Sequence, residues 1–473
     1  MDDNTIFQGR DIQPKEPESV NADGLSASPG IIPPDLSDSS EGINIQAILK
    51  AVLGFAILAV VIFLILHFII PLFSTKRNTH TTITYWGLWE GANIIDPVIA
   101  DFERQNPNIS VKYVEEDPKQ YRERLITRIE NGTGPDVFRF HNSWLPMLRN
   151  YLLPLSSDVI SGSDFSKLFY PVAKQDLTDN GAIYGIPLEI DTLSLFVNTD
   201  LFKSAGLSAP TTWDDFLTDC RHLTVKDQAG KILTAGCAMG TFNNITHAPD
   251  IISLLFKQNG ADLTNLSSNK YAAQALDFYT SFAKGSNNVW DNTLDPSILA
   301  FSKGNLAMYF GYSWDVFTIK SINKNLQFNI YPVPHLPGVN TGDTIASYWA
   351  EGVSAKSQHQ KAALTFMKFL TQKTTEEELF LEESKTRLFG EPYARTDLAG
   401  FLSGSSYLAP FVAQAPNAVS SFFASDTYDD GLNAQMNTYL GNAVSSILSD
   451  TSSQTAVDTL SQGVSQVLKQ YGQ

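Results

Sequence analysis

The residues from Ala51 to Ile70 form the most apolar stretch of the chain, and His67 is its single polar side chain. At a rise of about 1.5 Å per residue, a helix of this length spans roughly 30 Å, the hydrocarbon thickness of a bilayer. We therefore predict a transmembrane helix over residues 47–73. A buried core helix would be shorter and would carry a polar face. A cleavable signal peptide would have a basic start, a shorter apolar core and a small-x-small cleavage site.

The residues before this block have the opposite character. Residues 1–49 contain nine acidic and two basic residues, are rich in Pro, Ser, Asp and Gly, and have few large apolar side chains. Such a segment cannot bury enough surface to offset the entropy of ordering its backbone. We expect residues 1–46 to be disordered, and residues 74–82 to form a short polar linker.

Beyond the linker, the spacing of apolar residues alternates between the periods of strands and helices. Strands are predicted at Ile83–Trp86 and within ISVKYVEE and PDVFRF, separated by the helical patterns IIDPVIADFERQN and YRERLITRIENG. This β-α-β-α-β order predicts a parallel sheet with helices on both faces. Ligands of such sheets bind beyond the carboxyl ends of the strands, which draws attention to the loops 87–91 and 141–144. From about Leu432 onward the pattern is helical.

Composition and charge narrow the class of protein. With 43% apolar and 11% aromatic residues, the region after the linker can build a large core, and its length suggests two lobes or domains. The net charge of −17 disfavours binding to nucleic acid or to an anionic lipid surface. The chain has no G-x-S-x-G or H-E-x-x-H signature. We therefore predict no catalytic residue, no metal site and no cofactor.

The two cysteines, Cys220 and Cys237, allow two interpretations. A disulfide between them would add on the order of 3 kcal/mol of stability, but only in an oxidising compartment. Two buried free thiols are the alternative, and the sequence leaves both open.

Several segments, taken together, resemble one family, the extracellular solute-binding proteins of ABC importers, in the subgroup that includes maltose-binding protein. The resemblance covers nearly all of residues 83–473. It rests on ITYWGLWEG, NGTGPDVFRFHNSW, YGIPLEIDTLSLFVN, PTTWDDF, FSKGNLAMYFGYSW and EPYARTD, in that order along the chain.

The resemblance implies an α/β fold of two lobes joined by hinge crossings, the periplasmic-binding-protein-like fold. Lobe 1 would comprise about residues 83–188 and 346–390, and lobe 2 about residues 192–345 and 395–473. It also implies an extracellular main domain with an ABC permease as partner. Combined with the predicted transmembrane helix, this gives a single-pass membrane anchor with a cytoplasmic N-terminus, whereas many relatives are released or anchored by a lipid. The basic residues flanking the apolar block, Lys50 against Lys76 and Arg77, would by themselves weakly favour the reverse orientation.

Sugar binding needs flat aromatic surfaces for the C–H faces and planar polar groups for the hydroxyls. Residues of these types follow the predicted strand ends and hinge crossings, and Trp314 and Glu189 match the positions of ligand contacts in the family. The predicted ligand-binding residues are Trp89, Glu90, Arg139, His141, Asn142, Glu189, Asp191, Trp314, Asp315, Tyr348, Trp349 and Arg395.

We therefore predict a binding protein without enzymatic activity, which holds a carbohydrate between its lobes by hinge closure and delivers it to a permease. The aromatic content favours an oligosaccharide. Three alternatives stay open. One is a glycosidase built from Glu90, Glu189 and Asp191. Another is a receptor that presents its ligand to a membrane sensor. The last is a carrier of a non-sugar polar or anionic solute, which Arg139, His141 and Arg395 would suit.

Overall fold

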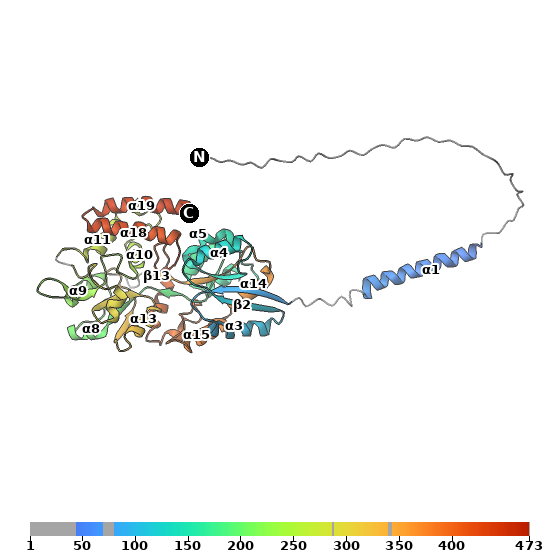
Figure 1. The fold of residues 1–473 in the computed structure, drawn as a ribbon, viewed down its shortest axis with the longest axis horizontal. Coiled ribbons are helices and arrows are strands. Elements are labelled where there is room, and N and C mark those ends of the chain that lie inside the picture. The colour runs from blue at the N-terminus through green and yellow to red at the C-terminus, as the bar shows by residue number, and fades with distance from the viewer. Residues whose placement is uncertain (1–43, 70–79, 286–287, 339–342, 473) are drawn as a thin grey trace, which may run out of the picture. The chain divides into compact units, whose positions relative to one another are not determined.

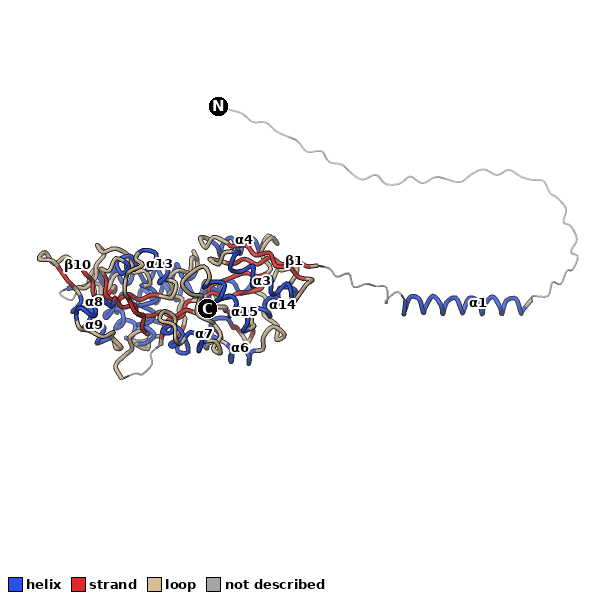
Figure 2. The backbone as a smooth tube through the Cα atoms, turned by 90° about the horizontal axis from the view of Figure 1, so that it is seen from below, coloured by secondary structure: helices blue, strands red, loops and turns tan. Residues whose placement is uncertain are grey.

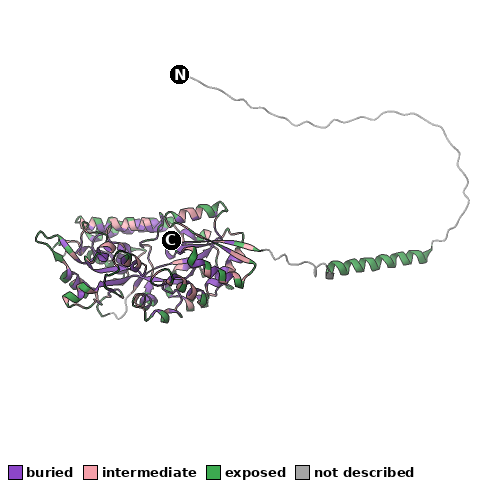
Figure 3. Ribbon diagram, turned by 60° about the horizontal axis from the view of Figure 1, so that its bottom comes forward, coloured by how far each residue is buried: buried purple, intermediate pink, exposed green. Residues whose placement is uncertain are grey.

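The computed structural model describes residues 44–69, 80–285, 288–338 and 343–472. The chain divides into two units, residues 1–77 and residues 78–473, and each is described by itself. The described part of the first unit is a helix, α1 (Ile45–Leu64), continued by a π-helical turn over Ile65–Ile69. Asn44 caps the helix, because its side-chain oxygen accepts a hydrogen bond from the Ala47 N–H. None of the α1 residues is buried (Figure 3).

Within the described residues, Ile45–His67 is the one helical segment long and apolar enough to cross a membrane. It begins two residues before the predicted span of 47–73, whose last four residues lie outside the described ranges. Residues 1–43 of the predicted disordered tail and residues 74–79 of the predicted linker also lie outside them. The prediction of disorder is wrong for Ile45 and Gln46, which belong to α1.

The second unit contains two main sheets. The first has the strand order β2-β1-β3-β14-β6. Strands β1, β2 and β3 run parallel, as the β-α-β-α-β pattern predicts, whereas β14 lies antiparallel to β3 and β6. Their bounds are β1 (Thr81–Gly87), β2 (Ile109–Glu115), β3 (Val137–His141), β6 (Ile186–Pro187) and β14 (Trp349–Val353).

Strand β1 begins at Thr81, two residues before the predicted start at Ile83. The Thr81 N–H donates to the Asn108 carbonyl at 2.8 Å, and Thr81 pairs in register with Ile109. Pairing with β2 therefore extends the strand into Thr81 and Thr82, whose polarity predicts a linker.

Helices pack against this first sheet through apolar faces. Helix α3 (Ala92–Gln105) buries Ile94, Ile95, Val98, Ile99 and Phe102, and it ends before Pro107. Helix α4 (Tyr121–Glu130) is followed by Gly132 in the left-handed conformation, with φ of 70°, which closes helices at low cost. The other α-helices in the segments 142–185 and 354–384, which adjoin strands of this sheet, are α5 (Leu145–Leu148), α6 (Gly162–Leu168), α7 (Pro171–Leu177), α14 (Gln360–Leu370) and α15 (Lys373–Ser384).

The second main sheet has the order β12-β8-β11-β10-β9. Every residue of β8 and β11 is buried, which accounts for their nearly continuous apolar sequences. The strand bounds are β8 (Ser194–Asn198), β9 (Val225–Lys226), β10 (Ile232–Cys237), β11 (Leu306–Gly311) and β12 (Phe328–Tyr331).

The helices connected with this second sheet include two long C-terminal ones, and the first begins at Leu432 as predicted. They are α8 (Thr199–Ala205), α9 (Trp213–Leu223), α10 (Ala248–Gln258), α11 (Tyr271–Ser281), α12 (Ser297–Ser302), α13 (Asp315–Ile322), α18 (Leu432–Leu448) and α19 (Ser453–Gln470). Cys220 on α9 and Cys237 on β10 form a disulfide, with their Cα atoms 5.3 Å apart.

A small sheet links the two main sheets. It consists of β7 (Asp191–Thr192), β13 (Thr344–Ser347) and β15 (Ala418–Val419), in the order β15-β13-β7. The chain passes from β6 in the first sheet through β7 to β8 in the second, and returns from β13 to β14. Figures 1 and 2 show α8 and α9 at one end of this unit and β1 and α3 at the other. The unit thus has the predicted two lobes with hinge crossings. The remaining short elements are β4 (Thr178–Asp179), β5 (Ala182–Ile183), α16 (Ala399–Leu402) and α17 (Ala409–Gln414).

Candidate ligand-binding site

A cavity of about 440 Å³ lies where the loops of both lobes meet the hinge. Residues after β1 and after β11 line it, together with hinge residues beside β7, β13 and β14. Its predicted members are Trp89, Glu90, Glu189, Asp191, Trp314, Asp315, Tyr348 and Trp349. Its members that the sequence analysis did not name are Thr246, Phe317, Thr318, Ser347, Arg387, Glu391, Asp426 and Tyr428.

Aromatic rings from both lobes give the cavity flat apolar surfaces. The Trp89 ring lies 4.7 Å from Trp349 and 6.1 Å from Tyr428, measured between ring centroids. Trp314 belongs to the other lobe and stacks on Tyr312 at 4.4 Å, with 17° between the ring planes. The stack fixes the orientation of the indole and leaves Trp314 partly exposed at the cavity.

Three lining residues adopt a backbone conformation that is costly for side chains other than glycine. Trp89, Asp426 and Tyr428 have φ of 64°, 54° and 54°. Trp89 and Tyr428 nevertheless keep 42% and 44% of their surface exposed. Strained residues concentrate at functional sites because the surrounding structure must hold them there. This observation favours the cavity as the binding site.

Arg139 lies beneath the cavity and does not line it, in contrast to its predicted ligand contact. It comes from the buried strand β3 and is 1% exposed. Its guanidinium pairs with Glu90, donates to Glu351 at 2.7 Å and lies 3.5 Å from Glu189. Burial raises the pKa of Glu351, although Arg139 opposes that shift. Arg139 therefore orients carboxylates of the cavity and has few donors left for a ligand.

His141 and Asn142 also support the cavity from outside. The His141 ring is bonded to Ser143 Oγ at 2.7 Å and to Ser347 Oγ at 3.1 Å, and burial lowers its pKa to about 3. The neutral ring lies 5.1 Å from Trp349 with its plane nearly perpendicular. Asn142 donates to Asp176 at 2.8 Å and lines a different cavity.

Arg395 is a structural clamp. Its Nε and Nη2 donate to Asp397 at 3.0 and 2.8 Å, and its Nη1 donates to the Thr371 carbonyl at 2.6 Å. It does not line the cavity. Glu391, four residues earlier in the same EPYARTD motif, does line it. Within this motif, the acidic residue rather than the basic one reaches the cavity.

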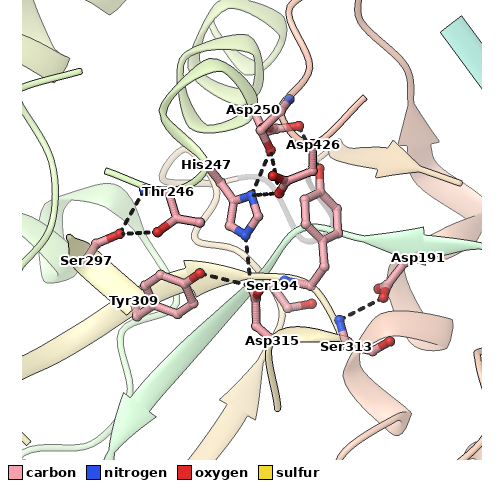
Figure 4. Close-up of polar contacts among 12 residues, drawn as sticks. Asp191, Ser194, Thr246, His247, Asp250, Ser297, Tyr309, Ser313, Asp315 and Asp426 are labelled. Carbon is pink, nitrogen blue, oxygen red and sulfur yellow. Dashed lines mark hydrogen bonds and ion pairs between the residues drawn. The ribbon is translucent and has the colours of Figure 1, made fainter. Parts of the chain in front are cut away.

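A buried histidine underlies the part of the cavity formed by lobe 2 (Figure 4). The His247 Nε2 atom lies 2.8 Å from Asp315 Oδ2, and Nδ1 lies 2.8 Å from Ser425 Oγ and 3.5 Å from Asp426 Oδ2. Burial opposes the charged form, but the surrounding aspartates outweigh it and raise the pKa of His247 to about 9. The imidazole is thus a cation at neutral pH, held behind two lining carboxylates.

Three further carboxylates of the cavity are costly to ionise, because they are buried. Burial raises the pKa of Glu189, Asp191 and Glu391. For Asp191, the neighbouring charge of Glu391 adds to the effect of burial. These groups can accept hydrogen bonds from a ligand, and they gain most from a ligand that carries positive charge.

Comparison with known proteins identifies the class. The chain belongs to the family of bacterial extracellular solute-binding proteins, whose sequence profile matches residues 89–377. The multiple sugar-binding protein of Streptococcus mutans is 25% identical over 324 residues, which are 63% of this chain and 73% of that protein. The maltodextrin-binding protein MdxE of Bacillus subtilis is 27% identical over 257 residues, 51% of this chain and 58% of its own length.

Solved structures share the fold. A cyclo/maltodextrin-binding protein in complex with maltotetraose aligns with a TM-score of 0.68 and 18% identity, over 82% of this chain and 97% of that one. The maltose-binding protein MalE of Listeria monocytogenes, in complex with maltose, aligns with a TM-score of 0.65 and 20% identity, over 83% and 98% of the two chains. The two-lobed α/β fold predicted from the sequence is therefore confirmed.

Proposed function

We propose that the cavity binds a carbohydrate and that the protein delivers it to an ABC permease without transforming it. The observation that carries this proposal is the set of aromatic rings and carboxylates that both lobes direct to one hinge cavity. The names of the sugar-binding relatives support the same class of solute. Closure of the lobes would bury the sugar between Trp89 and Trp314, and ligand would shift the population toward the closed form.

A ligand screen on the full-length protein in detergent micelles tests carbohydrate binding. A solute that binds the folded state stabilises it by RT ln(1 + [L]/Kd), roughly 2.7 kcal/mol at a hundred times Kd. We expect a clear rise of the unfolding temperature with at least one mono- or oligosaccharide, and none with polyols that lack a sugar ring. A screen in which only amino acids, peptides or anions stabilise the protein would contradict the proposal.

The absence of catalysis is part of this proposal. A glycosidase needs one free carboxylate and one carboxylic acid on opposite sides of the scissile bond. Glu90 instead pairs with Arg139, and the Asp191 carboxylate accepts hydrogen bonds from the backbone N–H groups of Ser313 and Thr192, at 2.7 and 2.8 Å. Release of reducing sugar during incubation with bound oligosaccharides would overturn this part of the proposal.

We further propose that α1 anchors the protein in the cell membrane with its N-terminus in the cytoplasm and residues 78–473 outside. The helix is apolar from Ala51 onward and none of its residues is buried, which supports a lipid environment. A tether keeps the binding domain at a high effective concentration near its permease. Protease added to intact cells should remove the large domain and spare the N-terminal tail, whereas the opposite pattern would reverse the topology.

A further inference from the structure

We propose that the solute carries a protonated amine, so that the cavity selects amino sugars over neutral sugars with the same skeleton. The inference rests on the proposed function, because it specifies the chemical class of the carbohydrate. It concerns the balance of charge around the cavity, which a neutral sugar would leave uncompensated.

Carboxylates outnumber cations on the cavity wall. Among the residues that the structure describes, Arg387 is the one basic side chain that lines it. Two further cations, Arg139 and His247, lie directly behind the wall. The lining carboxylates are Glu90, Glu189, Asp191, Asp315, Glu391 and Asp426.

The available cations are already engaged by other acids. Arg387 lies 2.8 Å from Glu383 and 3.3 Å from Glu391. His247 forms ion pairs with Asp315 and Asp426. Arg139 is shared between Glu90, Glu351 and the more distant Glu189. Among the described residues, Asp191 has no cation within ion-pair distance, and Glu189 and Glu391 each share their cation with other acids. The charge deficit therefore concentrates on these three acids of the hinge.

Glu189 provides an independent sign of a missing partner. It is 9% exposed and lines the cavity, yet its Oε2 atom has no hydrogen-bond partner in the described structure. Its Oε1 atom lies 3.5 Å from Arg139, beyond good hydrogen-bonding distance. A buried carboxylate oxygen without a donor is costly, so a ligand that donates to it would be strongly favoured.

The register of the hinge places two more acids against each other. Glu189 pairs antiparallel with Tyr393, and the Ile190 N–H donates to the Pro392 carbonyl at 2.9 Å. Continued by two residues, this register sets Asp191 opposite Glu391. The two carboxylates also share Ser313, whose N–H donates to Asp191 at 2.7 Å and whose hydroxyl lies 3.4 Å from Glu391. Like charges opposite each other are destabilising unless a cation lies between them.

An ammonium group on a sugar satisfies these requirements better than a metal ion does. The described residues contain no group of three or more His, Cys, Asp or Glu side chains arranged to hold a metal. An ammonium has three N–H donors, and its hydrogen bonds to carboxylates are charge-assisted. The indole faces of Trp89 and Trp314 suit the C–H face of a pyranose ring, which places the amine in a sugar.

Matched sugars test the inference by isothermal titration calorimetry on the full-length protein in micelles. Each set contains an amino sugar, its N-acetyl form and the parent sugar: glucosamine, galactosamine, and the β-1,4-linked glucosamine dimer with cellobiose as its parent. We expect the tightest-binding set to favour the amine at least tenfold over both neutral forms. If a neutral sugar binds as tightly as the corresponding amino sugar, or a maltodextrin binds as tightly as the best amino sugar, the inference is overturned and the proposed function stays intact. Failure of every saccharide to bind would contradict the proposed function itself.

Variants locate the charge that is responsible. Glu189→Gln preserves the shape of the side chain and should reduce the preference for the amine at least tenfold. Asp158→Asn removes the same charge from an exposed position and should leave the preference unchanged. Asp191→Asn repeats the test at the neighbouring acid if the Glu189 variant does not fold, as judged by its melting temperature. Retention of the full preference in both folded cavity variants would refute the assignment.

Discussion

Replacing His247 by glutamine tests the charge assignment behind the cavity. His247 is fully buried, and its ring lies between Asp315 and Asp426. Glutamine is neutral at every pH, yet its amide can still donate a hydrogen bond toward Asp315. The substitution therefore removes the titrating charge with little change in volume.

The magnitude follows from the difference between the pKa values of the folded and unfolded states. The folded value of about 9 lies above the unperturbed 6.5, because the nearby aspartates outweigh the effect of burial. The folded state thus binds the proton more tightly, and the resulting stabilisation is complete below pH 6.5. It is lost as pH rises from 6.5 through 9. At 1.36 kcal/mol per pKa unit, the loss amounts to about 3 kcal/mol.

Urea unfolding of wild type and His247→Gln between pH 6 and pH 9.5, followed by tryptophan fluorescence, measures this quantity. Burial also raises the pKa of Glu383 to about 8, so its contribution to the stability of both proteins falls as pH rises toward and past 8. The relevant quantity is therefore the difference in unfolding free energy between the two proteins at each pH. We expect the variant to be less stable at pH 6 and the difference to shrink by about 3 kcal/mol by pH 9.5. His222→Gln, at an exposed position on α9, should follow the wild-type curve. A difference that stays constant with pH would refute a charged His247.

Three other substitutions address separate features. Trp314→Ala should weaken sugar binding at least tenfold, about 1.4 kcal/mol in a titration, because the variant loses a stacking surface; unchanged affinity would remove Trp314 from the site. Replacing both Cys220 and Cys237 by alanine should lower the free energy of unfolding by about 3 kcal/mol, because the disulfide no longer restricts the unfolded chain. A reductant should destabilise the wild type and have no effect on this variant. Arg139→Met should cost about 3–5 kcal/mol in urea unfolding, because Glu90 and Glu351 would stay buried without a cation. A cost below about 1 kcal/mol would refute this account of the ion pairs.

Four predicted ligand-binding residues that line the cavity share a simple position in the fold. Trp89, Glu90, Trp314 and Asp315 each follow a strand, β1 or β11, whose apolar sequence can be read locally. The carboxyl ends of strands lead to the binding edge of an α/β sheet, so these side chains reach the cavity without knowledge of distant contacts.

Residues whose role depends on a distant partner could not be assigned in this way. Arg139 also lies near the carboxyl end of a strand, β3. Its guanidinium, however, donates to Glu351, which is 212 residues away in the sequence, and stays beneath the cavity. Asp426 and Tyr428 line the cavity from the irregular segment before α18. This segment has no helical or strand periodicity from which a site could be predicted. Their positions arise from the packing of the C-terminal part of the chain against both lobes.

The apolar helix and the alternation of strands and helices are local properties of the chain. The period at which apolar side chains recur along the chain distinguishes a helix from a strand. A long unbroken apolar run predicts a membrane-spanning helix. The charge of the cavity is a different kind of property. Whether Glu189 is paired, or His247 holds its proton, depends on which groups the hinge brings within a few ångströms, because electrostatic interactions strengthen at short range and in the absence of water. Only the tertiary structure decides those distances.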